Sequence, residues 1–308
     1  MLNTAAAMRK ECGADEVFFA CIDEWASGAL RRAALGWTPA KSLKGKISGI
    51  YVRPRPLDPE CRPRGPSGWL KRRGWQRLDQ KGWFHHVLVL DERLPEHSGR
   101  VRGKCRVSFM PEPTAGVSRP QPQQDEARQQ LGIPAQATVF LHYGLGTRRK
   151  GLHHVLEAWR NFPAGHHALL VVAGKAEPEF LPPLRQLQAA GRAVHLDRYI
   201  GGQEERLVMS ASDVVLLPYV NHYGSSNVLN TAAIGGRMVL ASDQGLVGYR
   251  VRRHGLGKLC CHDDAQSLAQ AVTQLAALGR EKLHGEHADN LKKFAALMSS
   301  DKLDKLFA

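Results

Sequence analysis

Short apolar runs alternate with longer amphipathic segments along most of the chain. The apolar runs have the length and composition of buried strands, and they cover residues 137–143, 168–173, 193–196, 214–217 and 238–241. The segments between and after them predict helices over residues 151–162, 179–190, 203–210, 227–234 and 265–278. Strands separated by helices in this way predict a parallel, doubly wound sheet with right-handed crossovers.

The first third of the chain shows a less regular version of the same alternation. We expect strands over residues 16–22, 47–52, 85–90 and 105–110, and helices over residues 1–13, 23–35 and 67–81. Residues 93–102 predict a polar helix or loop, and the five prolines in residues 53–66 predict an extended loop. An α/β nucleotide-binding domain usually opens with a strand and a glycine-rich turn, whereas this pattern opens with a helix. We therefore expect the first α/β domain to be incomplete.

A proline-rich segment without apolar periodicity, residues 111–124, predicts a linker between two domains. We accordingly divide the chain into a first domain over residues 1–118, a second domain over residues 119–278 and one or two further helices over residues 279–308. The second domain is expected to be a doubly wound α/β unit.

Residues 213–242 contain the most informative pattern, a strand, a small polar loop, a helix and a second strand. The helix is expected over residues 227–234, with Ser225 or Ser226 as its N-cap, and Gly235 and Gly236 end it. Its N-terminus would point out of the carboxyl edge of the sheet, where backbone N–H groups and the helix dipole favour an anion such as a diphosphate. A crossover of the same shape with nothing bound is the alternative.

Two other loops should follow strands at that same edge of the second domain. Both combine glycines, which allow a close approach of the backbone, with cationic side chains that suit a phosphate. The candidate residues in these two loops are Gly144, Gly146, Arg148, Arg149, Lys150, Gly174 and Lys175.

The composition is that of an ordinary globular protein, with 43% hydrophobic and 23% charged residues in 308. No window holds the roughly 20 apolar residues of a membrane span, and the first residues lack the apolar core of a signal peptide, so we expect a cytoplasmic protein. Six cysteines show no disulfide framework and no C-x-x-C metal spacing. Cys260 to Asp263, CCHD, is interpreted as structural because neighbouring strand side chains point to opposite faces, and no metal site is assigned.

The formal net charge of +14 is concentrated in residues 51–106, which hold 14 Lys and Arg against six Asp and Glu, a local excess of +8. Such a surface attracts nucleic acid, an anionic membrane or a phosphorylated substrate, and a solvated basic surface is the plainest explanation. Nucleic-acid binding is disfavoured because no helix-turn-helix, zinc-finger or aromatic sheet signature accompanies the charge.

Five segments carry a resemblance to a known family: VFLHYGLGTRRKGLHHVLEAW, LVVAGK, YIGGQEERLVMSASDVVLLPY, GSSNVLNTAAIGGRMVLASDQGLVGYRV and HGLGKLCCHDDAQSLAQAV. In order and spacing they resemble the family-4 (group 1) glycosyltransferases of the GT-B fold. The resemblance implies two Rossmann-like domains. Residues 1–118 would form the acceptor side, without the first strand and glycine-rich turn, residues 119–278 would bind the nucleotide-sugar, and residues 279–308 would pack back on the first domain.

By position, the resemblance gives Lys150 the role of the phosphate-binding lysine, with Arg148 and Arg149 beside it, and puts Gly201 near the nucleobase. The residues that it implies for the diphosphate and sugar are Tyr223, Gly224, Ser225, Ser226, Asn227 and Thr231. Tyr223 and Thr231 replace two glutamates of the family, and Leu145 replaces its phosphate-binding arginine. A threonine hydroxyl cannot act as a carboxylate acceptor for two ribose hydroxyls.

The function implied by the resemblance is transfer of a sugar from a nucleotide diphosphate to a glycan or lipid-linked acceptor, with retention of configuration. It implies no metal and no cofactor besides the donor substrate, and an anionic membrane surface is a further possible partner. The replaced glutamates leave an alternative open, a catalytically impaired GT-B-like protein that binds a glycan or another partner. No acceptor-side base is assigned; Asp23, Arg53 and His86 are interpreted as structural.

Overall fold

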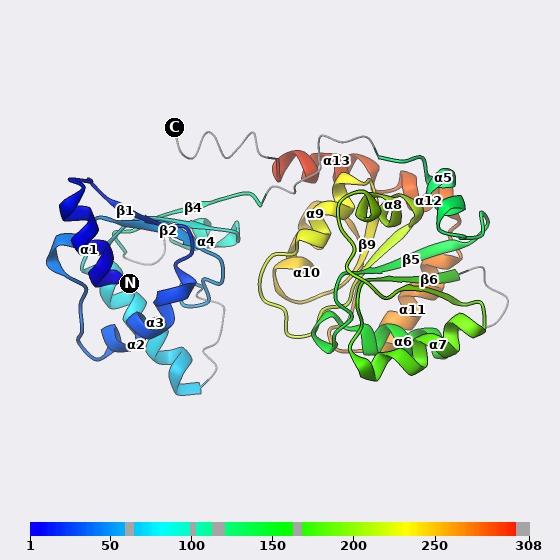
Figure 1. The fold of residues 1–308 in the computed structure, drawn as a ribbon, viewed down its shortest axis with the longest axis horizontal. Helices are drawn as coiled ribbons and strands as arrows, with labels where there is room; N and C mark the ends of the chain where they lie inside the picture. Colours follow the sequence, from blue (N-terminus) through cyan, green and yellow to red (C-terminus); the bar gives the residue numbers. More distant parts are fainter. Residues whose placement is uncertain (59–64, 99–102, 113–120, 163–167, 300–308) are drawn as a thin grey trace. The chain divides into compact units, whose positions relative to one another are not determined.

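The computed structural model describes residues 1–58, 65–98, 103–112, 121–162 and 168–299 (Figure 1). These residues form two compact α/β units, with unit 1 over Met1–Pro111 and unit 2 over Glu112–Lys305. The boundary between the units lies after Pro111, at the start of the predicted linker, whereas the sequence analysis placed it after residue 118. Residues 113–120 of that linker lie outside the described residues.

Unit 1 is built on a sheet of parallel strands in the order β1-β2-β3-β4. Its elements are α1 Leu2–Glu11, β1 Val17–Phe19, α2 Asp23–Ala34, η1 Lys41–Leu43, β2 Ile47–Tyr51, α3 Gly65–Gln80, β3 Phe84–Val89, α4 Arg93–Ser98 and β4 Arg106–Phe109. Helices α2 and α3 pack together over a core that includes Leu30, Ile47 and Val87. The strands follow the chain without a reversal of order, as one half of a doubly wound sheet does.

Unit 2 contains the larger sheet, whose parallel strands lie in the order β10-β9-β8-β5-β6-β7. The strands are β5 Thr138–Tyr143, β6 Ala168–Ala173, β7 Ala193–Leu196, β8 Val214–Leu217, β9 Met238–Ser242 and β10 Gly257–Cys260. The chain runs outward from β5 to β7, returns to the other side of β5 at β8, and continues outward to β10. This reversal is the doubly wound pattern that the alternation of strands and helices predicted.

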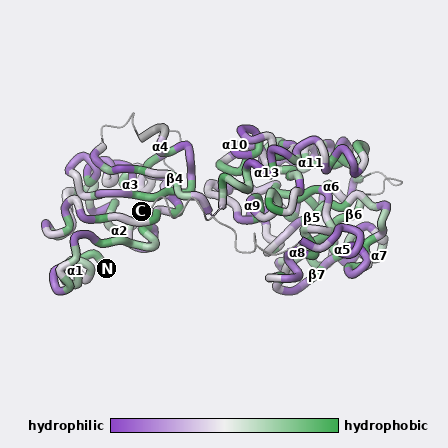
Figure 2. Tube along the Cα trace, turned by 90° about the horizontal axis from the view of Figure 1, so that it is seen from above, coloured by the Kyte–Doolittle hydropathy of each residue, from purple (hydrophilic) through white to green (hydrophobic). Residues whose placement is uncertain are grey.

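The helices of unit 2 cover both faces of this sheet. They are α5 Gln124–Gln130, η2 Arg148–Lys150, α6 Leu152–Arg160, η3 Pro178–Phe180, α7 Leu181–Ala189, α8 Gln203–Ala211, α9 Asn227–Ile234, α10 Gly245–His254, α11 Ala265–Ala276, α12 Arg280–Gly285 and α13 Ala288–Leu297. One core cluster joins α6, α7 and α11 to the sheet through residues such as Trp159, Leu184 and Leu268. The alternation of hydrophobic and hydrophilic positions along these helices is visible in Figure 2. Helix α10 and strand β10 were not predicted.

A buried ion pair fixes the amino ends of the two central strands. Asp213, which is fully buried just before β8, accepts hydrogen bonds from the Arg128 guanidinium at 2.7 Å and from the Val139 N–H at 2.6 Å. Burial alone would raise the pKa of Asp213, but hydrogen bonds from His284 and Val139 and the charge of Arg128 hold this pKa below its ordinary value. The pair therefore holds β5 and β8 side by side at their start.

The helices after residue 278 belong to unit 2. Leu283 of α12 joins its core cluster, and α13 packs against α9 and α10 through the buried side chains of Leu291 and Phe294. Helices α12 and α13, which the sequence analysis assigned to a terminal segment that packs back on the first domain, make these contacts within unit 2. Residues 300–308 lie outside the described residues. No helix in the described part of the chain is both long and apolar enough to cross a membrane.

Candidate functional site

The strand order of unit 2 reverses between β5 and β8, and in open α/β sheets ligands bind outside the carboxyl ends of the strands at such a point. The loops that leave these two strands are in direct contact. The Val220 N–H donates to the Arg149 carbonyl at 2.9 Å. Gly151 has φ 75°, and a Cβ at this position would lie 1.9 Å from the Pro218 carbonyl oxygen. Only glycine fits this crossing, which joins the loop after β5 to the loop after β8.

The loop after β6 joins the same group. The Gly146 N–H donates to the Lys175 carbonyl at 2.8 Å, and the Glu177 N–H donates to the Gly146 carbonyl at 2.9 Å. Gly144 and Gly174 lie backbone to backbone, since a Cβ on Gly174 would be 2.2 Å from the Gly144 carbonyl oxygen. The three loops that the sequence placed at one edge of the sheet are thus bonded to one another.

Lys150 is held at the centre of these loops. Its ammonium donates to the Tyr143 carbonyl at 3.2 Å and lies over Gly144, where a Cβ would be 2.4 Å from Nζ. Burial lowers the pKa of Lys150, and the neighbouring charge of Arg149 lowers it further. Beneath it lies His142, which is fully buried in β5. Burial, followed by the charge of Lys150, lowers the pKa of His142 to about 4, so this imidazole is neutral at physiological pH.

The two arginines of η2 diverge. Arg149 turns toward the β8 loop, where its Nη1 lies 3.0 Å from Nδ1 of His222. Arg148 turns the other way and forms a two-pronged pair with the Glu179 carboxylate, both hydrogen bonds measuring 2.9 Å. Arg149 is therefore the arginine that accompanies Lys150 at the β5–β8 crossing, whereas the charge of Arg148 is matched by a carboxylate.

The N-terminus of α9 faces the same crossing, with bounds that match the predicted helix. Ser226 is the N-cap residue, but its hydroxyl bonds to the Tyr219 hydroxyl at 3.1 Å and makes no capping hydrogen bond to the helix. The Ser225 carbonyl is bonded to Nε2 of His222 at 3.0 Å. The expected side-chain cap is thus absent from this described helix, and the Ser226 carbonyl accepts the Leu229 N–H at 3.1 Å instead. The dipole of α9 favours an anion at this N-terminus.

The remaining predicted residues lie around this centre. Gly201 follows β7 in a loop that is tied to β5 by the Tyr143 hydroxyl, which donates to the Ile200 carbonyl at 3.3 Å. Tyr223 and Gly224 lie between His222 and Ser225, and Asn227 is the first residue of α9. Thr231 lies one turn further along α9, and its Oγ1 is buried without a hydrogen-bond partner among the described residues.

Three residues at the site were missed by the sequence analysis. Tyr219 and His222 bridge the β8 loop to α9 and to Arg149. Gly245 begins α10 and lies against this loop, since a Cβ there would be 2.5 Å from the His222 carbonyl oxygen. The presence of a titratable histidine in the small polar loop 221–226 was the signal that could have found His222.

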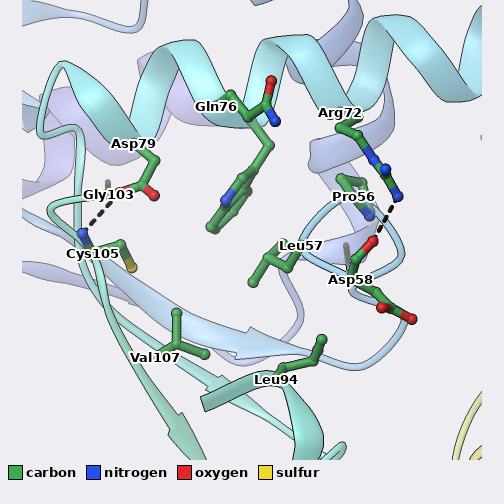
Figure 3. A pocket seen from close by; sticks show the side chains of 11 residues that line it. Pro56, Leu57, Asp58, Arg72, Gln76, Asp79, Leu94, Gly103, Cys105 and Val107 are labelled. Atoms are coloured by element: carbon green, nitrogen blue, oxygen red, sulfur yellow. Dashed lines mark hydrogen bonds between the residues drawn. The ribbon is translucent and has the colours of Figure 1, made fainter. Parts of the chain in front are cut away.

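Unit 1 contains a separate cavity of about 150 Å³ between α3, α4, β4 and the loop after β2 (Figure 3). Its walls are largely apolar, and three of its polar side chains form hydrogen bonds or accept them from the backbone nearby, or have a raised pKa. Asp79 accepts hydrogen bonds from the N–H groups of Lys104 and Cys105, and Arg72 donates to the Asp58 carbonyl at 2.6 Å. Burial raises the pKa of the Cys105 thiol far above its ordinary value. The cavity therefore offers apolar space and no thiolate.

The candidate residues of the first domain have structural contacts. The two oxygens of the Asp23 carboxylate accept hydrogen bonds from the backbone N–H groups of Val52 and Arg53, at 2.8 and 3.0 Å. Nε2 of His86 lies 2.9 Å from the Ser108 hydroxyl on the neighbouring strand. These contacts hold the ends and the face of the small sheet, as the structural interpretation of these residues requires.

Comparison with known proteins identifies the domain that carries this site. Residues 137–277 match the family "Glycosyl transferases group 1", and no curated protein sequence matches the chain. Among solved structures, HepE of Anabaena in complex with UDP is similar with a TM-score of 0.71 at 17% identity, over 99% of this chain and 80% of that one. A sucrose-phosphate synthase from Thermosynechococcus elongatus is similar with a TM-score of 0.67 at 17% identity, over 99% of this chain and 77% of that one.

WaaG, a glycosyltransferase of lipopolysaccharide biosynthesis, gives a TM-score of 0.60 at 16% identity, over 81% of this chain and 73% of that one. At these identities the likeness describes the fold, which is that of the two-domain GT-B proteins. The family match covers the strands and loops that build the β5–β8 crossing, from β5 through α11. Residues 137–277 of this chain therefore match the group 1 glycosyltransferase family, and the chain has the GT-B fold.

Proposed function

We propose that the chain transfers a sugar from a nucleotide diphosphate to the hydroxyl of a glycan or lipid-linked acceptor, with retention of configuration. The observation that carries this proposal is the meeting of Lys150, Arg149 and the N-terminus of α9 at the β5–β8 crossing. HepE, which shares the fold, has been solved with UDP and with UDP-glucose, and this supports UDP-sugars as the first donors to test.

The proposed chemistry depends on stabilising the diphosphate as it leaves the sugar. Lys150 and Arg149 supply two positive charges, and the first-turn N–H groups of α9 supply oriented donors. The Tyr219 and His222 contacts fix the β8 loop, so these groups need little reorganisation when the diphosphate forms. The hydroxyl of Thr231, which is buried and unpartnered among the described residues, would bond to one hydroxyl of the donor.

Donor binding can be tested by calorimetry with UDP-glucose and with GDP- and ADP-sugars. The matched pair is Lys150→Ala and Lys293→Ala, because each removes one positive charge and Lys293 is exposed on α13. We expect one donor class to bind the native chain and the Lys293 variant equally, and Lys150→Ala to weaken binding at least about tenfold, or ~1.4 kcal/mol. Equal binding by both variants would refute the role of Lys150.

Transfer is distinguished from binding by following donor consumption. Tyr223 and Thr231, at the positions of two family glutamates, are the observation that favours the alternative of a catalytically impaired protein that binds a glycan. We expect release of the nucleoside diphosphate in the presence of an acceptor glycan and a product whose anomeric configuration, read by NMR, matches that of the donor. Glycan binding without donor consumption would instead support the alternative, and an inverted product would exclude retention.

The acceptor is proposed to lie at the face of an anionic membrane on the cytoplasmic side. The basic segment 51–106 supports this location, because its excess of +8 favours anionic lipid headgroups. Co-sedimentation with vesicles that contain phosphatidylglycerol, compared with neutral vesicles, tests it. We expect binding to anionic vesicles that falls with salt, and equal binding to both kinds of vesicle would contradict the proposal.

A further inference from the structure

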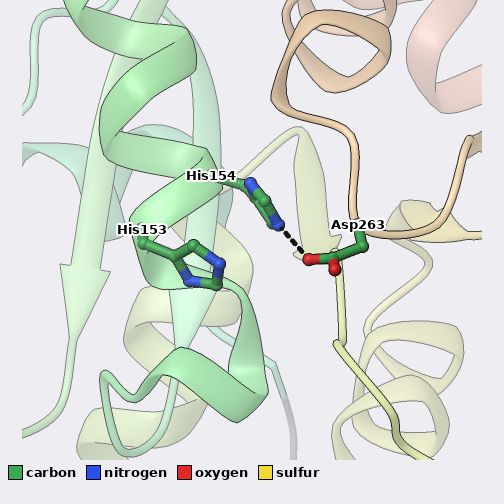
Figure 4. Close-up of side chains that lie close together, drawn as sticks. All are labelled: His153, His154 and Asp263. Atoms are coloured by element: carbon green, nitrogen blue, oxygen red, sulfur yellow. Dashed lines mark hydrogen bonds and ion pairs between the residues drawn. The ribbon is translucent and has the colours of Figure 1, made fainter.

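A cluster of two histidines and one aspartate lies in unit 2, apart from the contacts of the β5–β8 crossing. His153 and His154 are in the first turn of α6, and Asp263 is in the turn between β10 and α11 (Figure 4). One side-chain ligand atom from each of the three residues lies within 4.8 Å of the other two. Nε2 of His154 is 2.8 Å from Oδ1 of Asp263, and the two imidazole ring centres are 3.9 Å apart.

The backbone on both sides of Asp263 is fixed. The His262 N–H donates to the Asp243 carboxylate at 2.9 Å, and Asp264 caps α11 by accepting from the N–H groups of Gln266 and Ser267. Asp263 itself has φ 58°, the left-handed region that aspartate enters more readily than most residues. Its carboxylate is thus presented to α6 by a turn whose neighbours have their own partners.

The histidine side is held equally firmly. Helices α6 and α11 pack against each other, and Leu152 and Val155 of α6 share the core cluster with Leu268 of α11. The cluster is therefore built on two packed elements, which places its ligand atoms with little freedom.

The two imidazoles have unused nitrogen atoms. Nδ1 of His153 and Nδ1 of His154 are buried without a hydrogen-bond partner among the described residues. Buried polar atoms without partners are uncommon in folded proteins and call for an explanation.

Two imidazoles and one carboxylate form a donor set that suits Zn²⁺ and its neighbours in the first transition series, whereas Mg²⁺ and Ca²⁺ prefer oxygen ligands alone. Ligand bonds of about 2.1 Å in a tetrahedral site put neighbouring donor atoms about 3.4 Å apart. The His154–Asp263 pair is closer than this, and no pair of ligand atoms in the cluster is more than 4.8 Å apart, so small side-chain rotations reach the tetrahedral spacing. Asp263 has room to move because 54% of its side chain is exposed.

We propose that His153, His154 and Asp263 bind one divalent transition-metal cation of the Zn²⁺ class. With three protein ligands the ion would keep one position for water. It would join the start of α6, three residues beyond Lys150, to the turn that leads into α11. The inference does not depend on the proposed function, because it concerns residues outside the donor loops.

The test is a Zn²⁺ titration of the untagged, full-length protein after treatment with EDTA, in competition with a chromophoric chelator. We expect one tight equivalent of Zn²⁺ per chain. His154→Ala, His153→Ala and Asp263→Asn should each weaken the dissociation constant at least about tenfold, since loss of even an outer-shell partner of a metal site costs that much. Circular dichroism and the melting temperature in EDTA confirm that each variant is folded. Asp263→Asn, at a half-exposed side chain, keeps the test open if a histidine variant fails to fold.

Two variants control for other ligands on this histidine-rich chain. Cys261→Ser removes an exposed thiol two residues from Asp263, and His287→Ala removes a histidine whose Nε2 lies 3.9 Å from Glu286. Both should keep the tight equivalent. Substitution with Co²⁺ should give an absorption spectrum without thiolate charge transfer. The proposal is overturned by the absence of a tight equivalent, by unchanged affinity in the His154 and Asp263 variants, or by a thiolate band that is lost in Cys261→Ser.

Discussion

Gly151→Ala tests whether the contact between the loops after β5 and β8 holds the site together. Gly151 has φ 75°, and a Cβ there would be 1.9 Å from the Pro218 carbonyl oxygen. Gly132 is a matched control, since it has φ 65° and its Cβ would meet nothing within 4 Å. Both substitutions place alanine in the left-handed region, and only Gly151→Ala also forces two backbones apart.

The expected cost can be worked out from this comparison. A residue with a Cβ in the left-handed region costs about 1–2 kcal/mol, and the lower entropy of the unfolded alanine chain returns about 0.4–1 kcal/mol. Gly132→Ala should therefore lower the free energy of unfolding of unit 2 by roughly 1 kcal/mol. Gly151→Ala should lower this free energy of unfolding by about 1–3 kcal/mol more, which is the usual cost of forcing extra atoms into a well-packed region.

Urea unfolding and calorimetric titration with the donor nucleotide measure the two consequences. Thermal unfolding gives a second measure of stability: a loss of 1 kcal/mol lowers the melting temperature of a unit of this size by about 2–4 °C, so the two variants should differ measurably. Because the Arg149 carbonyl and the Val220 N–H are bonded across the same crossing, Gly151→Ala should also weaken donor binding at least about tenfold, and Gly132→Ala should not. Equal stability and equal affinity in the two variants would refute the reasoning.

Three further outcomes follow from individual contacts. Asp213→Asn should lower the free energy of unfolding by about 3–5 kcal/mol, because it leaves the buried guanidinium of Arg128 without its negatively charged partner, and a loss below about 1 kcal/mol in urea would contradict this. Burial lowers the pKa of His142 from 6.5 to about 4, so this side chain stays neutral in the fold. As the pH drops from 6.5 to 4, the free energy of unfolding should fall by roughly 3 kcal/mol, because the unfolded chain takes up a proton that the folded chain does not. His142→Leu should flatten that slope. Arg149→Ala should weaken UDP binding about tenfold and Arg148→Ala less, and the reverse order would contradict the assignment.

The architecture of unit 2 was predictable because its strands are continuous apolar runs. The bounds of α9 follow from Ser226 before the helix and Gly235 after it, and the observed helix matches them. Helix α10 was missed because glycines and arginines interrupt its apolar positions in GLVGYRVRRH. Strand β10 was missed because its four residues, GKLC, include a glycine and a lysine and do not form an apolar run. The local pattern also could not show that α12 and α13 belong to unit 2, because that depends on tertiary packing: α13 packs on α9 and α10, and Leu283 of α12 joins the core cluster.

The candidate site was predictable as a set of loops and not as a set of contacts. That Lys150 and the start of α9 share one sheet edge follows from the order of strands. That Arg149 faces His222 while Arg148 faces Glu179 depends on the direction of two adjacent side chains in a tight turn. The meeting of His154 with Asp263, 109 positions away, likewise depends on how α6 and α11 pack.

A structure of the protein with UDP tests the central claim most directly. We predict that the diphosphate binds at the β5–β8 crossing, within hydrogen-bond distance of the first-turn N–H groups of α9 and beside the ammonium of Lys150, with Arg149 on the same side. A diphosphate bound elsewhere on the chain, or a crossing that stays empty when calorimetry shows the protein to be saturated, would contradict the account.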